Sequence, residues 1–223
     1  MKKAFIFDLD GVIVDTAKYH FLAWQNLANG LGISFSSEQN EQLKGVSRVR
    51  SLEKILEWGN KTISEEEFTR LMKEKNEEYL EYISKMDTTE ILPDVPKILE
   101  YLITNKQPVA LGSASKNARI ILQKVKLLEK FNVIVDGTDV SKAKPDPEVF
   151  LIGAQKLKVA PEDCIVFEDS VAGVQAANIT NMISIGIGDP VVLKEADYVF
   201  KDFTEITEKF INQLITTKKT RTI

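Results

Sequence analysis

Short apolar runs alternate along the chain with longer segments in which apolar residues recur at helical spacing. Short runs that are apolar throughout predict strands buried on both faces. The six predicted strands are Ala4–Phe7, Val109–Gly112, Val133–Val135, Cys164–Phe167, Ile183–Ile187 and Tyr198–Phe200. Helices are predicted at Val95–Asn105, Lys116–Val125, Pro147–Leu157, Val171–Asn178 and Phe203–Gln213. This alternation indicates a parallel sheet with helices on both faces.

One long stretch interrupts the alternation directly after the first strand. From about Thr16 to Met86, apolar residues recur at helical spacing and no convincing strand pattern occurs. Ser64 stands three residues before Glu67, which is the spacing of a capping box at the start of a helix. The four helices expected here are Ala17–Gly30, Ser37–Leu43, Arg50–Trp58 and Ser64–Ser84. We therefore predict a helical domain inserted between the first and second strands.

Composition narrows the class of protein. The 223 residues are 43% hydrophobic and carry a formal net charge of −4, which indicates a folded globular chain and disfavours a nucleic-acid or anionic-membrane binder. No apolar run is long enough to cross a bilayer, and Asp8 and Asp10 interrupt the apolar start that superficially resembles a signal peptide. Cys164 is the only cysteine, which suits a reducing cytoplasm, so a cytoplasmic location is expected. The tail 216–223, with three basic residues, is expected to be a solvated terminus.

Chemically distinctive residues follow four of the predicted segments. Because the carboxyl ends of parallel strands meet at one edge of a sheet, residues just after the strands are expected to converge there. Two carboxylates follow the first strand, where apolar packing does not explain them. Small hydroxyl residues follow the second strand and lead into a helix. The four pieces are Phe7–Gly11, Gly112–Asn117, Lys144–Pro145 and Phe167–Ser170.

Taken one at a time, these pieces have ordinary structural explanations. The acids could be turn and capping residues, Lys144 could be a solvated surface lysine, and Ser113–Asn117 could simply start a helix. Taken together they favour a site, because several like charges at one edge would repel without a cation. Carboxylates without a histidine or cysteine cluster favour Mg²⁺ over zinc. With Mg²⁺ and Lys144 present, the edge is nearly neutral and can accept a phosphate.

The four pieces resemble the motifs of the haloacid dehalogenase superfamily of phosphotransferases. The residues that carry the resemblance are Asp8-Leu9-Asp10-Gly11-Val12, Ser113, Lys144 and Glu168-Asp169, in the family's order and spacing. The resemblance covers essentially the whole chain. It implies an α/β fold in which a Rossmann-like parallel-sheet core, residues 1–15 and 88–223, carries an inserted helical cap domain, residues 16–87.

The same resemblance implies roles for the motif residues. The first aspartate, Asp8, would attack phosphorus and become an aspartyl phosphate, and Asp10 would serve as general acid and base. Ser113 and Lys144 would support the transferring phosphate. One Mg²⁺ per subunit would be held by Asp8, Asp10, Glu168 and Asp169. The second carboxyl, Asp10, argues against a dehalogenase, whose chemistry lacks this proton shuttle.

The inserted segment carries a second set of candidate residues. Lys44–Arg48 offers two cations, a hydroxyl and backbone amides around a glycine, which suits a phosphate that is not reacting, although a solvated linker would look similar. His20 and Trp24 lie one turn apart on the first inserted helix. Each could also be an ordinary packing residue.

These segments, with the core residues Ser113–Asn117, resemble the β-phosphoglucomutase family. That family implies interconversion of β-glucose 1-phosphate and glucose 6-phosphate through enzyme-bound β-glucose 1,6-bisphosphate. The implied substrate-binding residues are His20, Trp24, Lys44, Gly45, Val46, Ser47, Arg48, Ser51, Lys75, Ala114, Ser115, Lys116 and Asn117. Arg48 would hold the distal phosphate together with Lys116 and Asn117. Val49-Arg50 departs from the family, which commonly has acidic residues there, and adds positive charge beside Arg48.

Two rival functions remain open from the sequence. The core motifs are the same in a sugar-phosphate phosphatase, because both enzymes form the same aspartyl phosphate. A signalling receiver module also accepts phosphate on an aspartate of an α/β sheet, but its phosphoacceptor follows a middle strand and it lacks the helical insertion. The expected partners are small-molecule sugar phosphates, not nucleic acid or membrane, and the expected state is a monomer.

Overall fold

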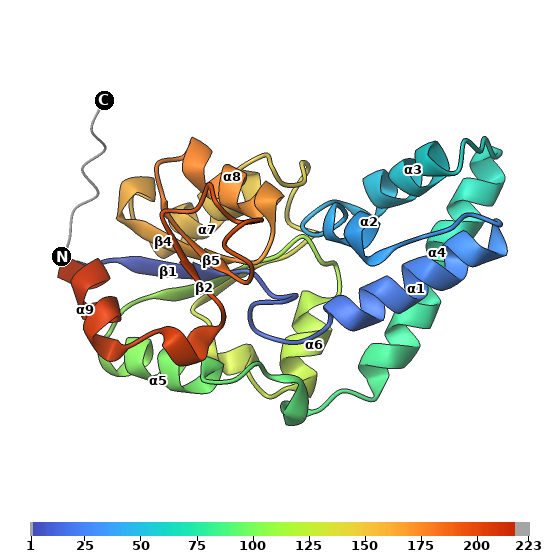
Figure 1. The fold of residues 1–223 in the computed structure, drawn as a ribbon. Coiled ribbons are helices and arrows are strands. Elements are labelled where there is room, and N and C mark those ends of the chain that lie inside the picture. Colours follow the sequence, from blue (N-terminus) through green and yellow to red (C-terminus); the bar gives the residue numbers. More distant parts are fainter. Residues whose placement is uncertain (1, 217–223) are drawn as a thin grey trace.

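The structure, a computed structural model, describes residues 2–216 and consists of a layered α/β core with a helical domain beside it (Figure 1). Residues 217–223 of the predicted solvated tail lie outside the described part. The core is one sheet of six parallel strands in the order β3-β2-β1-β4-β5-β6. The strands are β1 Ala4–Phe7, β2 Val109–Gly112, β3 Val133–Val135, β4 Cys164–Glu168, β5 Ile183–Ile187 and β6 Tyr198–Phe200. All six predicted strands and the parallel sheet are confirmed.

Helices cover both faces of the sheet because the central strands are apolar on both sides. Helices α5, α6 and α9 lie on one face of the sheet, and α7 and α8 lie on the other (Figure 1). Phe5 and Phe7 of β1 pack into the core cluster on the first face, whereas Ala4 and Ile6 pack into the cluster on the second. The ring of Phe7 stacks on that of Phe167 in β4, with centroids 4.6 Å apart. The core helices are α5 Val95–Thr104, α6 Ala118–Lys124, α7 Glu148–Leu157, α8 Val171–Ile179 and α9 Glu208–Thr216.

The inserted segment forms the predicted helical cap, with an apolar cluster of its own. Trp24, Leu52, Ile55 and Leu71 are among the buried residues of that cluster. Its helices are α1 Ala17–Gly30, α2 Ser37–Glu41, α3 Arg48–Trp58 and α4 Glu65–Ser84. The Ser64 side chain accepts a hydrogen bond from the backbone N–H of Glu67, as the capping spacing predicts. The fold class, an α/β core with an inserted helical cap, is confirmed.

Two chain segments join the cap to the core, and they lie side by side. The backbone N–H of Asp15 donates to the carbonyl of Glu90 at 2.9 Å, and that of Leu92 donates to the carbonyl of Ile13 at 3.0 Å. The outgoing and returning segments therefore form a short paired connection at the edge of the site. Short 3₁₀ turns occur at Thr88–Glu90, Leu128–Lys130, Pro161–Asp163 and Phe203–Glu205.

Some helix boundaries differ from the predictions. The prediction of one helix over Phe203–Gln213 is wrong, because the segment is a 3₁₀ turn, a buried extended Ile206 and then α9. Thr207 begins the second helix, since its hydroxyl accepts from the N–H of Phe210 at 3.2 Å. The predicted helix from Lys116 begins instead at Ala118, because Ser115 and Asn117 form a tight turn first. No helix in the described residues is both long enough and apolar enough to span a membrane.

Candidate active site between core and cap

One cavity of about 380 Å³ lies between the carboxyl edge of the sheet and the cap. Its size is in the usual range for small-molecule sites. Every residue that the sequence marks as a site residue lines it, with the sole exception of Glu168. The two sets of candidates, one from strand ends and one from the inserted helices, therefore face the same space.

Lys144 is the central cation of the core side. Its Nζ lies 2.5 Å from Asp8 Oδ1 and 2.5 Å from Glu168 Oε1, and donates to the carbonyl of Gly112 at 3.1 Å. Burial alone would lower the pKa of Lys144, but Asp8 and Glu168 outweigh it and raise the pKa above its usual value. Asp8 and Glu168 thus favour the charged form of a buried ammonium that lies beside the carboxyl of Asp8. The interpretation of Lys144 as a surface lysine is wrong.

Glu168 has a supporting position and does not line the cavity. It is fully buried, and while one oxygen receives Lys144, the other accepts hydrogen bonds from the N–H and the hydroxyl of Ser170 at 2.9 and 2.8 Å. The α8 residue Gly173 leaves room for it, because a Cβ there would lie 1.9 Å from the Glu168 carboxyl. The role of Glu168 as a direct metal ligand stays a prediction.

Asp169 faces the cavity and meets the cap. Its Oδ2 lies 3.2 Å from Lys44 Nζ, so a cap lysine pairs with a core acid. The adjacent Gly45 has φ +71°, and a Cβ on it would lie 2.6 Å from Ser170 Oγ. The cap loop can approach the core this closely because Gly45 has no side chain. Burial raises the pKa of Asp169 to about 7, with Lys44 acting in the opposite direction.

The carboxylates at this edge fit a hard cation. Burial raises the pKa of Asp8 well above its usual value, partly offset by Lys144, and the nearby acids raise it further. Gly11 has φ +82°, and a Cβ on it would lie 2.2 Å from Asp169 Oδ2, so glycine keeps that carboxylate clear. No group of three or more metal-ligating side chains converges among residues 2–216. Mg²⁺, however, is commonly held through only one or two carboxylates, with waters and substrate phosphate completing its shell.

Asp10 belongs to the core by sequence but turns its side chain toward the cap. Its Oδ1 accepts a hydrogen bond from the hydroxyl of Thr16 and one of 3.5 Å from Tyr79. His20 Nε2 lies 3.8 Å from the same oxygen. Burial raises the pKa of Asp10, against the lowering effect of the Thr16 hydrogen bond. A carboxyl with a raised pKa beside several proton-bearing groups is suited to taking up and releasing a proton.

A lysine, a histidine and two aromatic rings form the cap wall near Asp10. Lys75 Nζ lies 2.9 Å from His20 Nδ1, 4.5 Å from the centre of the Trp24 ring and 5.0 Å from that of Tyr79. Burial and the neighbouring Arg48 lower the pKa of Lys75 to about 7. The cap thus places polar groups against aromatic rings, an arrangement suited to a sugar, which has both hydroxyls and apolar faces.

The loop after β2 supplies hydroxyls and backbone groups to the cavity. Ser113 is 1% exposed, and its Oγ accepts from the N–H of Ser115 at 3.1 Å. Ser115 Oγ in turn accepts from the N–H of Asn117 at 3.2 Å. Gly137 lies against the back of this loop and donates its N–H to the Ser115 carbonyl at 3.2 Å. The loop is therefore held both by its own hydroxyls and by the segment after β3.

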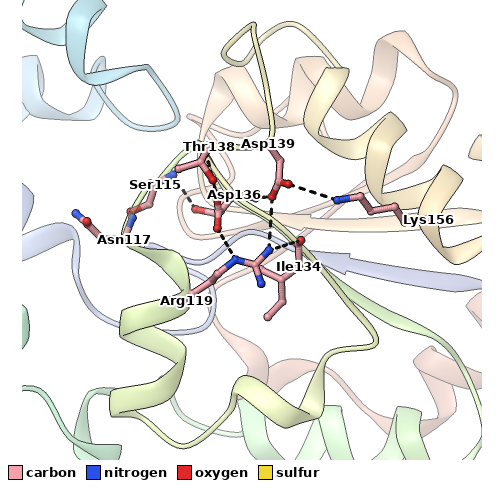
Figure 2. Close-up of polar contacts among 9 residues, drawn as sticks. Ser115, Asn117, Arg119, Ile134, Asp136, Thr138, Asp139 and Lys156 are labelled. Carbon is pink, nitrogen blue, oxygen red and sulfur yellow. Dashed lines mark hydrogen bonds and ion pairs between the residues drawn. The ribbon is translucent and has the colours of Figure 1, made fainter.

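A polar network fixes that supporting segment (Figure 2). Arg119 Nε lies 2.9 Å from Asp136 Oδ2, and Asp136 Oδ1 accepts from the N–H and hydroxyl of Thr138. Asp139 Oδ2 accepts from the N–H of Asp136 at 3.0 Å, and its other oxygen lies 3.5 Å from Lys156 Nζ. Because Asp136 is 2% exposed and fully bonded, the turn that carries Gly137 is rigidly placed behind Ser115.

Arg48, at the start of α3, brings a cation to the far side of the cavity. Ser47 begins that helix, since its hydroxyl accepts from the N–H of Arg50. Val49 lines the cavity, but Arg50 pairs with Glu53 and Glu57 along its own helix at 3.0 and 2.8 Å. The extra positive charge of Val49-Arg50 is therefore neutralised on the helix surface and not added to the site.

Three residues that bond side chains of the site were missed from the sequence, although they do not line the cavity: Thr16 and Tyr79, which bond Asp10, and Asn76, whose carbonyl oxygen bonds Arg48 at 2.6 Å. Lining residues such as Asn40, Met72 and Gly137 were also not identified. Tyr79 and Lys75 are four residues apart on α4, so helical spacing from Lys75 could have identified Tyr79. Thr16 and Asn76 carried no such signal, because the contacts that identify them run to residues of other elements.

Comparisons with known proteins find one family, which includes both a mutase and a phosphatase. The family model described as haloacid dehalogenase-like hydrolase matches residues 2–179. A β-phosphoglucomutase of Bacillus subtilis is 40% identical over 216 residues, and the match covers 95% of this chain and 94% of that protein. A fructose-1-phosphate phosphatase of Escherichia coli is 30% identical over 182 residues, and the match covers 82% of this chain and 94% of that protein. The crystal structure of a β-phosphoglucomutase from Clostridium difficile is 42% identical and covers 96% of this chain and 97% of its own, with a TM-score of 0.92.

Gly137→Ala should displace the Ser113–Asn117 loop. The added Cβ would lie 2.3 Å from the carbonyl oxygen of Ala114, so the backbone must move, at a cost of roughly 1–3 kcal/mol in the free energy of unfolding. Urea unfolding measures the cost, and backbone amide chemical shifts of residues 113–117 report the movement. Gly30→Ala is the control, since nothing lies within 4 Å of its new Cβ. Identical stability and shifts in both variants would show that Gly137 does not hold the loop.

Proposed function

The chain belongs to the haloacid dehalogenase-like hydrolase family, and from that premise we propose that it catalyses the β-phosphoglucomutase reaction. It is an intramolecular phosphotransferase that interconverts β-glucose 1-phosphate and glucose 6-phosphate. The observation that carries this proposal is the single cavity in which the core carboxylates face a second group of cations and amides from the cap. The similarity to two β-phosphoglucomutases over almost the whole chain supports it.

The two ends of the cavity suit the two ends of a sugar bisphosphate. At the core end, Lys144 lies beside Asp8 and Ser113 lines the same cavity, so both can bind the phosphoryl group that is transferred. At the far end, Arg48, with the loop residues Lys116 and Asn117, can bind the phosphate that is not reacting. A monophosphate phosphatase needs only the first of these groups. An intermediate with two phosphates uses both.

In the first half-reaction, the phosphorylated Asp8 donates its phosphoryl group to the 6-hydroxyl of β-glucose 1-phosphate. The bond between phosphorus and the Asp8 oxygen breaks as the bond to the sugar oxygen forms, and Asp10 takes the hydroxyl proton. The product is β-glucose 1,6-bisphosphate. Lys144, whose Nζ lies 2.5 Å from Asp8 Oδ1, can stabilise charge on the Asp8 carboxylate that is released.

In the second half-reaction, the bisphosphate has reoriented and its 1-phosphate lies beside Asp8. The Asp8 carboxylate attacks this phosphorus, the bond to the sugar O1 breaks, and Asp10 returns its proton to that oxygen. Glucose 6-phosphate leaves and phospho-Asp8 is regenerated. A cap closed over the cavity keeps water away, which favours transfer to sugar over hydrolysis.

We propose one Mg²⁺ per subunit, held by Asp8, Glu168 and Asp169 and by the backbone carbonyl of Asp10. When bound, it would neutralise negative charge on the phosphoryl oxygens during transfer. In the structure, Glu168 also bonds Lys144 and Ser170. The proposed ligand set is the one expected from the sequence.

The remaining assignments are also proposals. We assign the cap to residues 16–87 and the core to residues 1–15 and 88–223, and we expect a monomer located in the cytoplasm. The residues proposed to contact the sugar phosphate are His20, Trp24, Lys44, Gly45, Val46, Ser47, Arg48, Ser51, Lys75, Ala114, Ser115, Lys116 and Asn117, all of which line the cavity.

A sugar-phosphate phosphatase is the alternative that one observation favours. Relatives about 30% identical include phosphatases of phosphorylated carbohydrates, and they would share the aspartyl-phosphate chemistry. The two functions differ in whether a sugar hydroxyl or water accepts the phosphoryl group from Asp8.

An assay coupled to glucose 6-phosphate dehydrogenase separates them. With Mg²⁺ and a trace of β-glucose 1,6-bisphosphate, β-glucose 1-phosphate should yield glucose 6-phosphate, whereas the α-anomer should yield far less. Release of inorganic phosphate, measured in parallel, should be slow because the cap excludes water. Phosphate release as fast as sugar conversion would make the protein a phosphatase.

Metal removal is expected to abolish turnover. Excess chelator should leave the edge formed by Asp8 and Asp169 without its balancing charge, and Mg²⁺ should restore the activity better than Ca²⁺, whose looser and larger coordination misplaces the nucleophile. The measurement is mutase turnover before chelation, after it, and after each metal is added back. Undiminished turnover in chelator would rule out the proposed metal.

Substitution of Asp8 and substitution of Asp10 should impair different steps of the reaction. Asp8→Asn removes the nucleophile, so no phosphoenzyme should form from any donor. Asp10→Asn removes only the proton shuttle, so the rate of phosphoryl transfer to the sugar should fall by roughly 10²–10⁴-fold. Phosphorylation of Asp8 by acetyl phosphate should fall less, because the leaving group of acetyl phosphate needs little protonation. Mass spectrometry of the phosphoenzyme and mutase turnover are measured on both variants. An aspartyl phosphate on Asp8→Asn would show that another residue is the nucleophile.

A further inference from the structure

Asn76 joins the cap to the core at the far end of the cavity. Its Oδ1 accepts a hydrogen bond of 2.6 Å from the guanidinium of Arg48, which begins α3, and one of 3.3 Å from the amide of Asn117, which precedes α6. Asn76 itself lies on α4. One carbonyl oxygen thus connects three helices and receives two of the donors assigned above to the distal phosphate.

Arg48 is unusual among the arginines of the cap because its partner is neutral. Arg50 and Arg70 both pair with glutamates on their own helices. Within residues 2–216, Arg48 forms no ion pair, although α4, against which it lies, carries seven glutamates. The half-buried guanidinium is therefore held in place while its charge remains uncompensated.

We propose that Asn76 is a positioning residue that presents Arg48 and Asn117 to the distal phosphate and keeps Arg48 free of a competing carboxylate. This inference rests on the distal phosphate site of the proposed function. Before substrate binds, the Asn76 carbonyl oxygen accepts hydrogen bonds from the Arg48 guanidinium and the Asn117 amide. These two groups are therefore already ordered when the phosphate binds, and binding does not have to supply the free energy of ordering them.

An amide serves this purpose and a carboxylate does not. A carboxylate of nearly the same shape would accept the same two hydrogen bonds, but it would form an ion pair with Arg48. The phosphate would then have to break that pair or bind beside a like charge. The neutral charge of Asn76, more than its shape, is expected to set the affinity for the phosphorylated sugar.

Asn76→Asp tests this with the smallest possible change. KM for β-glucose 1-phosphate should rise about 10- to 100-fold, the usual worth of a hydrogen bond to a charged group, with a smaller change in kcat. Phosphorylation of Asp8 by acetyl phosphate, which has no distal phosphate, should stay within about twofold because its single phosphate binds at the other end. Lys73→Gln is the matched control, since it changes the net charge equally on the same helix at an exposed position, and its KM should stay within about twofold.

Two further variants separate charge from packing. Asn76→Ala removes the hydrogen bonds without adding charge, and its KM should rise only about two- to fivefold. In an Arg48→Ala background, Asn76→Asp should have little further effect on KM, because the two residues act through one contact. An equal rise in KM for Asn76→Ala and Asn76→Asp, or an undiminished effect of Asn76→Asp without Arg48, would overturn the inference.

Calorimetric binding of glucose 6-phosphate keeps the test independent of turnover. If the wild-type protein binds glucose 6-phosphate but has no mutase activity, the proposed function is refuted and the role of Asn76 is not. In that case, Asn76→Asp should still bind glucose 6-phosphate about 10- to 100-fold more weakly than the wild type does. Equal binding by the two proteins would refute the role of Asn76, and failure of wild type to bind would refute both.

Discussion

The buried ammonium of Lys144 is the contact on which the site depends. It bonds three strand ends at once, through Asp8 after β1, the carbonyl of Gly112 at the end of β2 and Glu168 in β4. Removing a cation from water is costly unless each of its donors finds a partner, so these three contacts have to form together. They hold the nucleophile at a set position on the carboxyl edge of the sheet. The same ammonium provides positive charge where a phosphoryl group would be transferred.

The cap adds recognition to this chemistry. The cavity exists only where the two parts meet, and they meet through specific contacts, including Lys44 with Asp169 and Asn76 with Asn117. Asp10 connects the two, since it follows a core strand yet bonds the cap residues Thr16 and Tyr79. The position of the cap can therefore influence the group proposed to move the proton.

The fold was largely predictable because its strands are apolar throughout and its helices carry regular apolar spacing. Parallel strands then bring their ends together, which is why Asp8, Ser113 and Asp169 could be placed at one edge in advance. The break at Ile206 was not predictable, because this apolar residue fits a helical pattern and is buried equally well in an extended backbone. Local spacing does not distinguish a continuous helix from a 3₁₀ turn followed by a new helix.

The sequence by itself determined the sheet, the inserted helices and the chemical types at the strand ends, because these follow from periodicity and from residue identity. Only the tertiary structure decided how the charges are divided among partners. It placed Glu168 behind Lys144, turned Arg50 toward Glu53 and Glu57, and left Arg48 with the neutral Asn76. These pairings join residues far apart in sequence or compete among several nearby acids. They depend on distances of a few ångströms, which residue spacing along the chain does not specify.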